Sequence, residues 1–295
     1  PRLGMHMPIV RYGHWGRPVL LFPTAGSDLF DVERFLLIHA IQQHIEAGRI
    51  TVFSIDTVNT LSWMDKHVGP RESGRRQALY ASYVEEEVVP HIRRVLENDS
   101  ARIMVTGASF GAFHAANMFF RRPDLFDTLV AMSGFYDLSP SFTKGYSDDN
   151  IYFNNPSWFV PKITDSRMLD LIKHHSQIHI LSGQGAYEAP DASRRFSRIL
   201  WEKGWSAAGP LELCRMALKP LGERAARPES DTLEALESFF RDRVSYQLEV
   251  AGYAGAVRRS ALPVGWADLA DLRGRCEALS AFAEDARFAS LGQSA

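Results

Sequence analysis

The sequence predicts an α/β fold on a mostly parallel sheet, because short apolar runs alternate with longer segments of helical periodicity. The runs "RPVLLFP" and "RITVFSID" are rich in strand-forming residues, and residues 31–48 between them carry apolar side chains at helical spacing. Near-continuous apolar strands separated by helices are typical of a parallel sheet that is covered on both faces. With 295 residues, the chain can bury a large core without disulfide bonds. We therefore expect a three-layer sandwich through about residue 205.

The alternation continues along this part of the chain in a regular order. We expect strands at residues 7–14, 17–23, 49–56, 102–107, 128–134 and 177–183. We expect helices at residues 31–48, 75–98, 110–122, 166–175 and 191–204, and an irregular stretch at residues 135–161.

The character of the chain changes near residue 205. All ten histidines lie at or before His179, and no strand-like run follows residue 205. Residues 233–253 and 266–283 carry apolar side chains at helical spacing. These patterns predict a first domain at residues 1–205, a linker at 206–228 and an all-helical extension at 229–295.

Composition excludes several classes of function. Acidic and basic residues are mixed and the net charge is −2, so no basic face indicates nucleic-acid binding. The two cysteines, Cys214 and Cys276, have no metal-binding spacing, so we expect no metal and no cofactor. The sequence shows no signal peptide and no apolar run of membrane-spanning length, so we expect no membrane association and a cytoplasmic location by default.

The segment Gly107-Ala108-Ser109-Phe110-Gly111 has the pattern G-x-S-x-G, between an expected strand and an expected helix. In this context the pattern predicts a sharp turn that lifts a serine hydroxyl clear of the sheet edge. The glycines allow close backbone approach in such a turn. We therefore predict that Ser109 is a nucleophile.

An acyl-transfer serine needs two backbone N–H groups directed at the oxyanion that forms on the substrate. The residue after the nucleophile, Phe110, supplies one of them by its position. The loop in "LLFPTAGSD" is the candidate for the second donor. Ala25 stands where such a donor is expected, although Thr24 and Gly26 remain alternatives.

The acid that orients a catalytic base is expected on the loop in "ILSGQGAYEAPDASRR". Glu188 and Asp191 are the candidates, and Glu188 is preferred because Asp191 also suits an N-cap position. A histidine base should follow the acid, but none occurs after His179. His114 on the expected elbow helix fits a packing role better than a catalytic one.

Residues 1 to about 205 resemble the putative esterase family of the α/β-hydrolase superfamily. The resemblance rests on "TGASFGAFHAANMFFRRPDLFD", "AMSGFYD" and "DDNIYFNNP", among other segments. It implies an α/β-hydrolase fold, with Ser109 as nucleophile, Phe110 and Ala25 as oxyanion donors and Glu188 as acid. The family continues into a segment of the type GHDWPWW, whose histidine completes the triad, whereas this sequence departs after Trp205. We therefore expect a serine esterase that acts on a small carboxylic ester, with impaired activity.

The tail, residues 229–295, resembles the C-terminal region of the β subunit of bacterial glycyl-tRNA synthetase. The segments "LESFFRDRVSYQLEVAGY" and "ALPVGWADLADLRGRCEALSAF" carry this resemblance. It implies an alternative function, in which a non-catalytic fusion or fragment binds tRNA or a protein subunit through its tail. Both ends of the chain are expected to lie inside the two family patterns.

Overall fold

The computed structural model describes residues 2–183, 189–205, 244–245, 248–249, 252–264 and 269–284. Two compact units make up the chain, Pro1–Ala207 and Ala208–Ala295, and each is described by itself. The expected linker at 206–228 and the candidate acid Glu188 lie outside the described residues.

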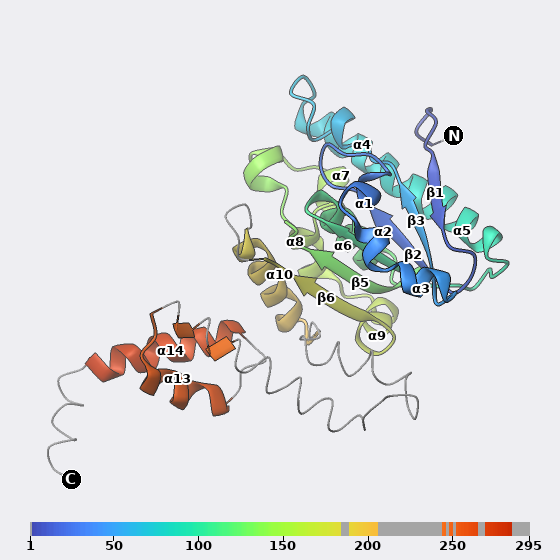
Figure 1. Cartoon of the computed structure of the whole chain (residues 1–295). Helices are drawn as coiled ribbons and strands as arrows, with labels where there is room; N and C mark the ends of the chain where they lie inside the picture. The colour runs from blue at the N-terminus through green and yellow to red at the C-terminus, as the bar shows by residue number, and fades with distance from the viewer. Residues whose placement is uncertain are drawn as a thin grey trace, which may run out of the picture. The chain divides into compact units, whose positions relative to one another are not determined.

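The first unit contains a six-stranded sheet with the strand order β1-β3-β2-β4-β5-β6 (Figure 1). The strands are β1 (Ile9–Tyr12), β2 (Arg17–Phe22), β3 (Ile50–Ile55), β4 (Ile103–Ala108), β5 (Phe126–Met132) and β6 (Gln177–Leu181). Strand β1 is antiparallel to β3, and every other pairing in the sheet is parallel. The predicted α/β class and mostly parallel sheet are confirmed.

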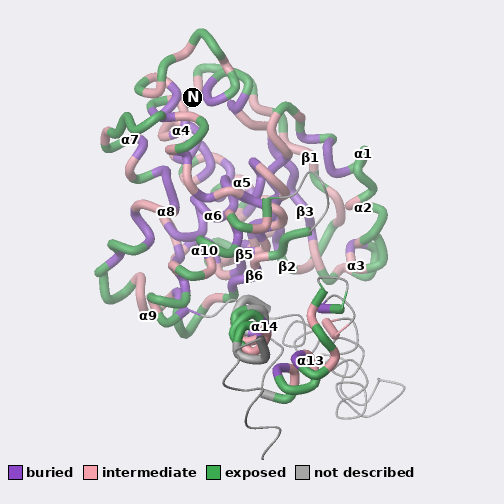
Figure 2. Tube along the Cα trace, turned by 90° about the vertical axis from the view of Figure 1, so that its left-hand side faces the viewer, coloured by how far each residue is buried: buried purple, intermediate pink, exposed green. Residues whose placement is uncertain are grey.

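Helices cover both faces of this sheet. They are α1 (Asp31–Arg34), α2 (Leu37–Ala40), α3 (Gln42–Glu46), α4 (Pro70–Tyr83), α5 (Val89–Val95), α6 (Phe110–Arg121), α7 (Asp149–Tyr152), α8 (Pro156–Phe159), α9 (Ser166–His174) and α10 (Pro190–Glu202). Figure 2 shows the strands between α1–α3 on one side and α4 and α6 on the other.

The side chains of β2 show how the two faces are filled. Leu20 and Phe22 belong to the main core, with residues of α4, α5 and α6. Val19 and Leu21 point to the opposite face and pack with residues of α1, α2 and α3. Because successive side chains of a strand face opposite sides, one apolar run supplies both cores. This explains why β2 reads as a continuous apolar segment.

The expected single helix at 31–48 is wrong, because the segment forms the three short helices α1, α2 and α3. Leu36 has a φ of 57°, in the left-handed region that a bulky side chain rarely adopts, and this interrupts the helix. Phe35 and Leu36, at this interruption, are 73% and 65% exposed. Apolar spacing alone does not predict such a break.

The expected helix at 75–98 begins earlier and contains one wide turn. Helix α4 starts at Pro70, and a π-helical turn, Val84–Val88, joins it to α5. Pro90 has no N–H to donate, so a locally altered hydrogen-bond pattern is expected before it. The expected irregular stretch 135–161 contains the short helices α7 and α8.

The described part of the second unit is helical, as predicted. Helix α13 (Gly255–Ala261) and helix α14 (Leu269–Glu284) pack around a small core. Cys276 is fully buried in that core and is not in a disulfide, so it packs there as a small apolar residue. None of the helices that the structure describes combines the length and the apolar character that a membrane crossing needs.

Candidate active site

Ser109 connects the carboxyl end of β4 to the first residue of α6, the elbow helix. Its φ of 54° and ψ of −115° lie in a sparsely populated backbone region for a residue with a side chain. The Ser109 N–H donates to the Met132 carbonyl at 3.0 Å, which extends the β4–β5 pairing into the turn. A strained conformation held by the sheet on one side and a helix on the other is typical of a functional site.

Two glycines permit this turn because no side chain fits at their positions. A Cβ atom on Gly107 would lie 2.5 Å from the Gly111 carbonyl carbon. A Cβ atom on Gly111 would lie 2.2 Å from the Phe22 carbonyl oxygen. The start of α6 therefore lies directly against the backbone at the end of β2.

This contact brings the expected oxyanion loop, residues 23–28, next to the elbow. Phe22 is in register with Gly107 across the β2–β4 pairing, so the loop leaves the sheet beside Ser109. Ala25 packs against the aromatic cluster that contains Phe110. Both expected oxyanion donors therefore belong to segments that meet at this edge of the sheet.

The backbone N–H groups of Phe110 and Ala25 differ from that of Thr24 in whether they already donate a hydrogen bond. Phe110 is the first residue of α6, so its N–H has no partner within the helix. The Thr24 N–H donates to the Asp31 carboxylate at 2.9 Å. Ala25 and Gly26 donate no backbone hydrogen bond to any other described residue. Of the three candidate loop donors, Thr24 is therefore already engaged.

Aromatic side chains form one wall beside the turn. The Phe110 ring lies 4.8 Å from that of Phe135 and 5.4 Å from that of Phe142, measured between ring centroids. Trp63 and Trp158 belong to the same cluster. The loop after β5 thus brings apolar side chains to the elbow.

His114 lies on α6 but is buried and engaged on both ring nitrogens. The Trp63 indole N–H can only donate, and it donates to Gln77 Oε1 at 3.1 Å. Gln77 Nε2 is then the donor toward His114 Nδ1 at 3.4 Å, so His114 Nε2–H donates to Asn59 Oδ1 at 2.9 Å. Burial lowers the pKa of His114 to about 3. His114 is therefore a neutral structural residue, as its packing role predicted.

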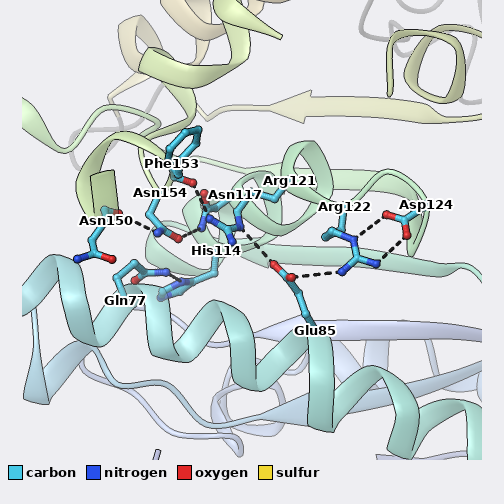
Figure 3. Close-up of polar contacts among 10 residues, drawn as sticks. All are labelled: Gln77, Glu85, His114, Asn117, Arg121, Arg122, Asp124, Asn150, Phe153 and Asn154. Carbon is cyan, nitrogen blue, oxygen red and sulfur yellow. Dashed lines mark hydrogen bonds and ion pairs between the residues drawn. The ribbon is translucent and has the colours of Figure 1, made fainter. Parts of the chain in front are cut away.

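Charged residues hold the far end of α6 against the π-helical turn Val84–Val88 that follows α4 (Figure 3). Glu85 Oε1 and Oε2 accept from Arg121 Nε and Arg122 Nη1, each at 3.3 Å. Arg122 also pairs with Asp124, at 2.7 Å. The Glu85 side chain is only 12% exposed, so this carboxylate depends on its two arginines for compensation.

We expect Glu85→Ala to lower the free energy of unfolding by about 2 kcal/mol, because it removes the carboxylate that two partly buried guanidinium groups share. Guanidinium chloride unfolding followed by circular dichroism measures the change. Glu72→Ala is the matched control, since Glu72 also pairs with two arginines, Arg75 and Arg76, but at the surface. The control should have a much smaller effect. Equal losses in both variants would contradict a special role for Glu85.

The two candidate acids are placed differently. Glu188 lies outside the described residues. Asp191 is the second residue of α10, whose N-cap is Ala189, so the expected N-cap role of Asp191 is wrong. Pro190 at the first helical position starts the helix one residue earlier. The Asp191 side chain is 75% exposed and pairs with Arg194 at 2.8 Å.

All ten histidines fall within the described residues, and His114, on the elbow helix itself, bonds to Gln77 and Asn59 rather than to the Ser109 hydroxyl. Asp56 directly follows β3, and the sequence alone did not single it out as a candidate acid. An acidic residue directly after an apolar strand is nevertheless a pattern that could have indicated it. Burial raises the pKa of the Asp56 carboxyl group.

Across the part of the chain that the structure describes, no cluster of three or more metal-ligating side chains occurs.

The sequence matches the family described as Putative esterase over residues 26–203. A search of curated proteins finds no match. The family match ends before the tail, and no comparison supports the expected resemblance of residues 229–295 to the glycyl-tRNA synthetase β subunit. The tRNA-binding alternative therefore has no support from the comparisons.

Several solved structures are similar in fold. A ferulic acid esterase has 14% identity and a TM-score of 0.50, with 68% of this chain and 88% of that chain covered. The S-formylglutathione hydrolase from Agrobacterium tumefaciens also has 14% identity and a TM-score of 0.50, with 68% and 79% covered. The S-formylglutathione hydrolase from Staphylococcus aureus has 15% identity and a TM-score of 0.49, with 70% and 83% covered. The first two share the fold of the first unit.

The family match spans more than half of the 295 residues, and it includes β4, the Ser109 turn and β5. The chain therefore belongs to the Putative esterase family.

Proposed function

We propose that this chain is a serine hydrolase that accepts the acyl group of a small carboxylic ester on Ser109. The observation that carries the proposal is the backbone of Ser109, with a φ of 54° between a parallel strand and the start of a helix. Membership of an esterase family supports the same chemistry. Phe110 and Ala25 are proposed as the oxyanion donors and Glu188 as the acid.

In the proposed reaction, Ser109 Oγ forms a bond to the ester carbonyl carbon and loses its proton to a base. The carbonyl oxygen becomes negative and accepts hydrogen bonds from the Phe110 and Ala25 N–H groups. Collapse of this intermediate breaks the bond to the alcohol oxygen, which takes up a proton and leaves. Water then attacks the acyl-serine, which releases the carboxylic acid and restores the serine hydroxyl.

The helix that begins at Phe110 favours negative charge at its amino end, so its dipole assists the same intermediate. The aromatic wall of Phe135 and Phe142 is proposed to contact an apolar part of the substrate. Because both ring nitrogens of His114 are engaged and no histidine follows His179 in the sequence, water is the proposed proton acceptor. We expect turnover to be slower than that of a complete triad by about four to six powers of ten.

The test is acylation of the protein by p-nitrophenyl acetate, followed by intact mass and release of p-nitrophenol. We expect one acetyl group on the wild-type chain, located at residue 109 by peptide mapping, and none at that position in Ser109→Ala. Free imidazole should accelerate acylation of the wild type more than that of Ser109→Ala, because it supplies the base from solution.

Ser133→Ala is a matched control, because Ser133 also has a positive φ, of 47°, at the end of the neighbouring strand β5. This variant should keep the acetylation of Ser109. Equal acetyl transfer in the wild type and Ser109→Ala, with or without imidazole, would refute the proposed function.

A further inference from the structure

We propose that Asp31 is a positioning residue that holds the oxyanion loop, residues 23–28, in place, so that Ala25 rather than Thr24 presents its N–H to the substrate. This inference rests on the proposed function and adds the residue that prepares its oxyanion site. Asp31 is the first residue of α1, and only 4% of it is exposed.

Both oxygens of the Asp31 carboxylate are bonded to the loop. Oδ2 accepts from the Thr24 N–H at 2.9 Å, and Oδ1 accepts from the Ser27 hydroxyl at 2.6 Å. Thr24 and Ser27 are the ends of a tight turn, in which the Ser27 N–H approaches the Thr24 carbonyl at 3.4 Å. One buried side chain thus fixes both ends of a turn whose two middle residues are Ala25 and Gly26.

The turn is anchored on its other side by the sheet. Phe22 pairs in register with Gly107, and the Phe22 and Pro23 carbonyl groups lie against Gly111 at the start of α6. Pro23 has no N–H, and the N–H of Thr24 is occupied by Asp31. The first N–H in the loop that remains for a substrate oxygen is therefore that of Ala25.

A buried carboxylate near a developing oxyanion would oppose catalysis if its charge were not compensated. Arg34 provides compensation, because its Nη2 lies 4.0 Å from Asp31 Oδ1 and donates to the Ser27 hydroxyl at 2.9 Å. The same nitrogen donates to Asp28 at 2.8 Å. Asp31 therefore acts through the backbone of the loop and does not itself face the substrate.

Preorganisation explains why this tether matters for the reaction. An oxyanion donor stabilises the intermediate only if it already points to the correct place before charge develops. Loss of the tether releases the turn and lets the Ala25 N–H move or bond to water. The expected consequence is a slower acylation step with little change in substrate binding.

The experiment compares Asp31→Ala, Asp31→Asn and Glu33→Ala in the full chain. Asn keeps the shape of Asp, and its amide can accept from the Thr24 N–H while donating to the Ser27 oxygen. We expect Asp31→Ala to reduce the acylation rate of Ser109 by about 10- to 100-fold, with the half-saturating concentration of p-nitrophenyl acetate within about twofold of wild type. Asp31→Asn should restore most of the rate, and Glu33→Ala, at an exposed acidic residue of the same helix outside the loop, should retain it.

Amide hydrogen exchange of residues 23–28 gives a second measurement that does not depend on activity. Asp31→Ala should accelerate exchange of the Thr24 amide by at least about tenfold, whereas Asp31→Asn should keep it protected. Normal acylation in folded Asp31→Ala, or unchanged Thr24 exchange, would overturn the inference. If Asp31→Ala does not fold, Asp31→Asn and Ser27→Ala test the inference instead. Faster exchange of the Thr24 amide in Asp31→Asn would overturn it. Loss of Ser109 acylation in both variants would also overturn it.

The two proposals fail in different ways. If the wild type acquires no acetyl group at Ser109, the proposed function fails, and the Thr24 amide alone then supports or overturns the tether. If the wild type is acylated and Asp31→Ala behaves identically, the proposed function stands and only the role of Asp31 fails.

Discussion

Gly111→Ala should destabilise the first unit by about 3 kcal/mol and strongly reduce acylation of Ser109. The added methyl group would lie 2.2 Å from the Phe22 carbonyl oxygen and 3.0 Å from that of Pro23. Neither contact involves a flexible side chain, so backbone must move. Because Phe22 and Pro23 lead into the oxyanion loop, the same movement displaces the proposed Ala25 donor.

Urea unfolding and the p-nitrophenol burst measure these two effects on one preparation. Gly69→Ala is the control, because Gly69 has a φ of −75° and no atom lies within 4 Å of an added Cβ. This variant should change the free energy of unfolding by less than about 0.5 kcal/mol. A Gly111→Ala protein as stable as Gly69→Ala would show that β2 and α6 are not packed as closely as the structure has them.

His114 should make the stability of the first unit strongly dependent on pH. Its pKa is about 3 in the folded state, against an ordinary value of 6.5, so between these values the unfolded chain binds a proton that the folded chain does not. Stability is therefore highest above pH 6.5 and falls as the pH drops towards 3. The slope approaches about 1.4 kcal/mol per pH unit.

The measurement is the free energy of unfolding at pH 7, 6, 5 and 4 for the wild type and His114→Gln. A glutamine amide can keep one donor and one acceptor at this place but cannot be protonated in this range. Between pH 6 and 4, the wild type should lose about 2 to 3 kcal/mol more than His114→Gln. His67→Gln, which removes an exposed imidazole, controls for the loss of one histidine. Parallel curves for the wild type and His114→Gln would contradict a buried neutral His114.

The sheet and the elbow could be predicted because both depend on local pattern. Apolar runs of strand length and the spacing of Gly107, Ser109 and Gly111 each carry their own structural signal. The start of α4 was also readable, since Pro70 followed by Glu72 is a common helix beginning. The predicted start at residue 75 was too late because the prediction used apolar spacing alone.

Other features depend on contacts between distant parts of the chain. Nothing near Leu36 in the sequence marks a left-handed residue, because its conformation results from how α1 and α2 pack on the sheet. Asp31 reads as an ordinary acidic residue in a first helical turn, and only the folded loop brings Thr24 and Ser27 to its two oxygens. Apolar spacing likewise cannot show that His114 bonds to Asn59 and Gln77.

The backbone at position 109 also bears on how variants of this chain should be screened. A glycine would adopt a φ of 54° without the steric cost of a side chain, which amounts to about 1 kcal/mol or more. Selection for melting temperature alone would therefore favour the loss of the very hydroxyl group on which the proposed chemistry depends. A thermostability library should keep residue 109 fixed, or sort each round with a reagent that labels serine covalently.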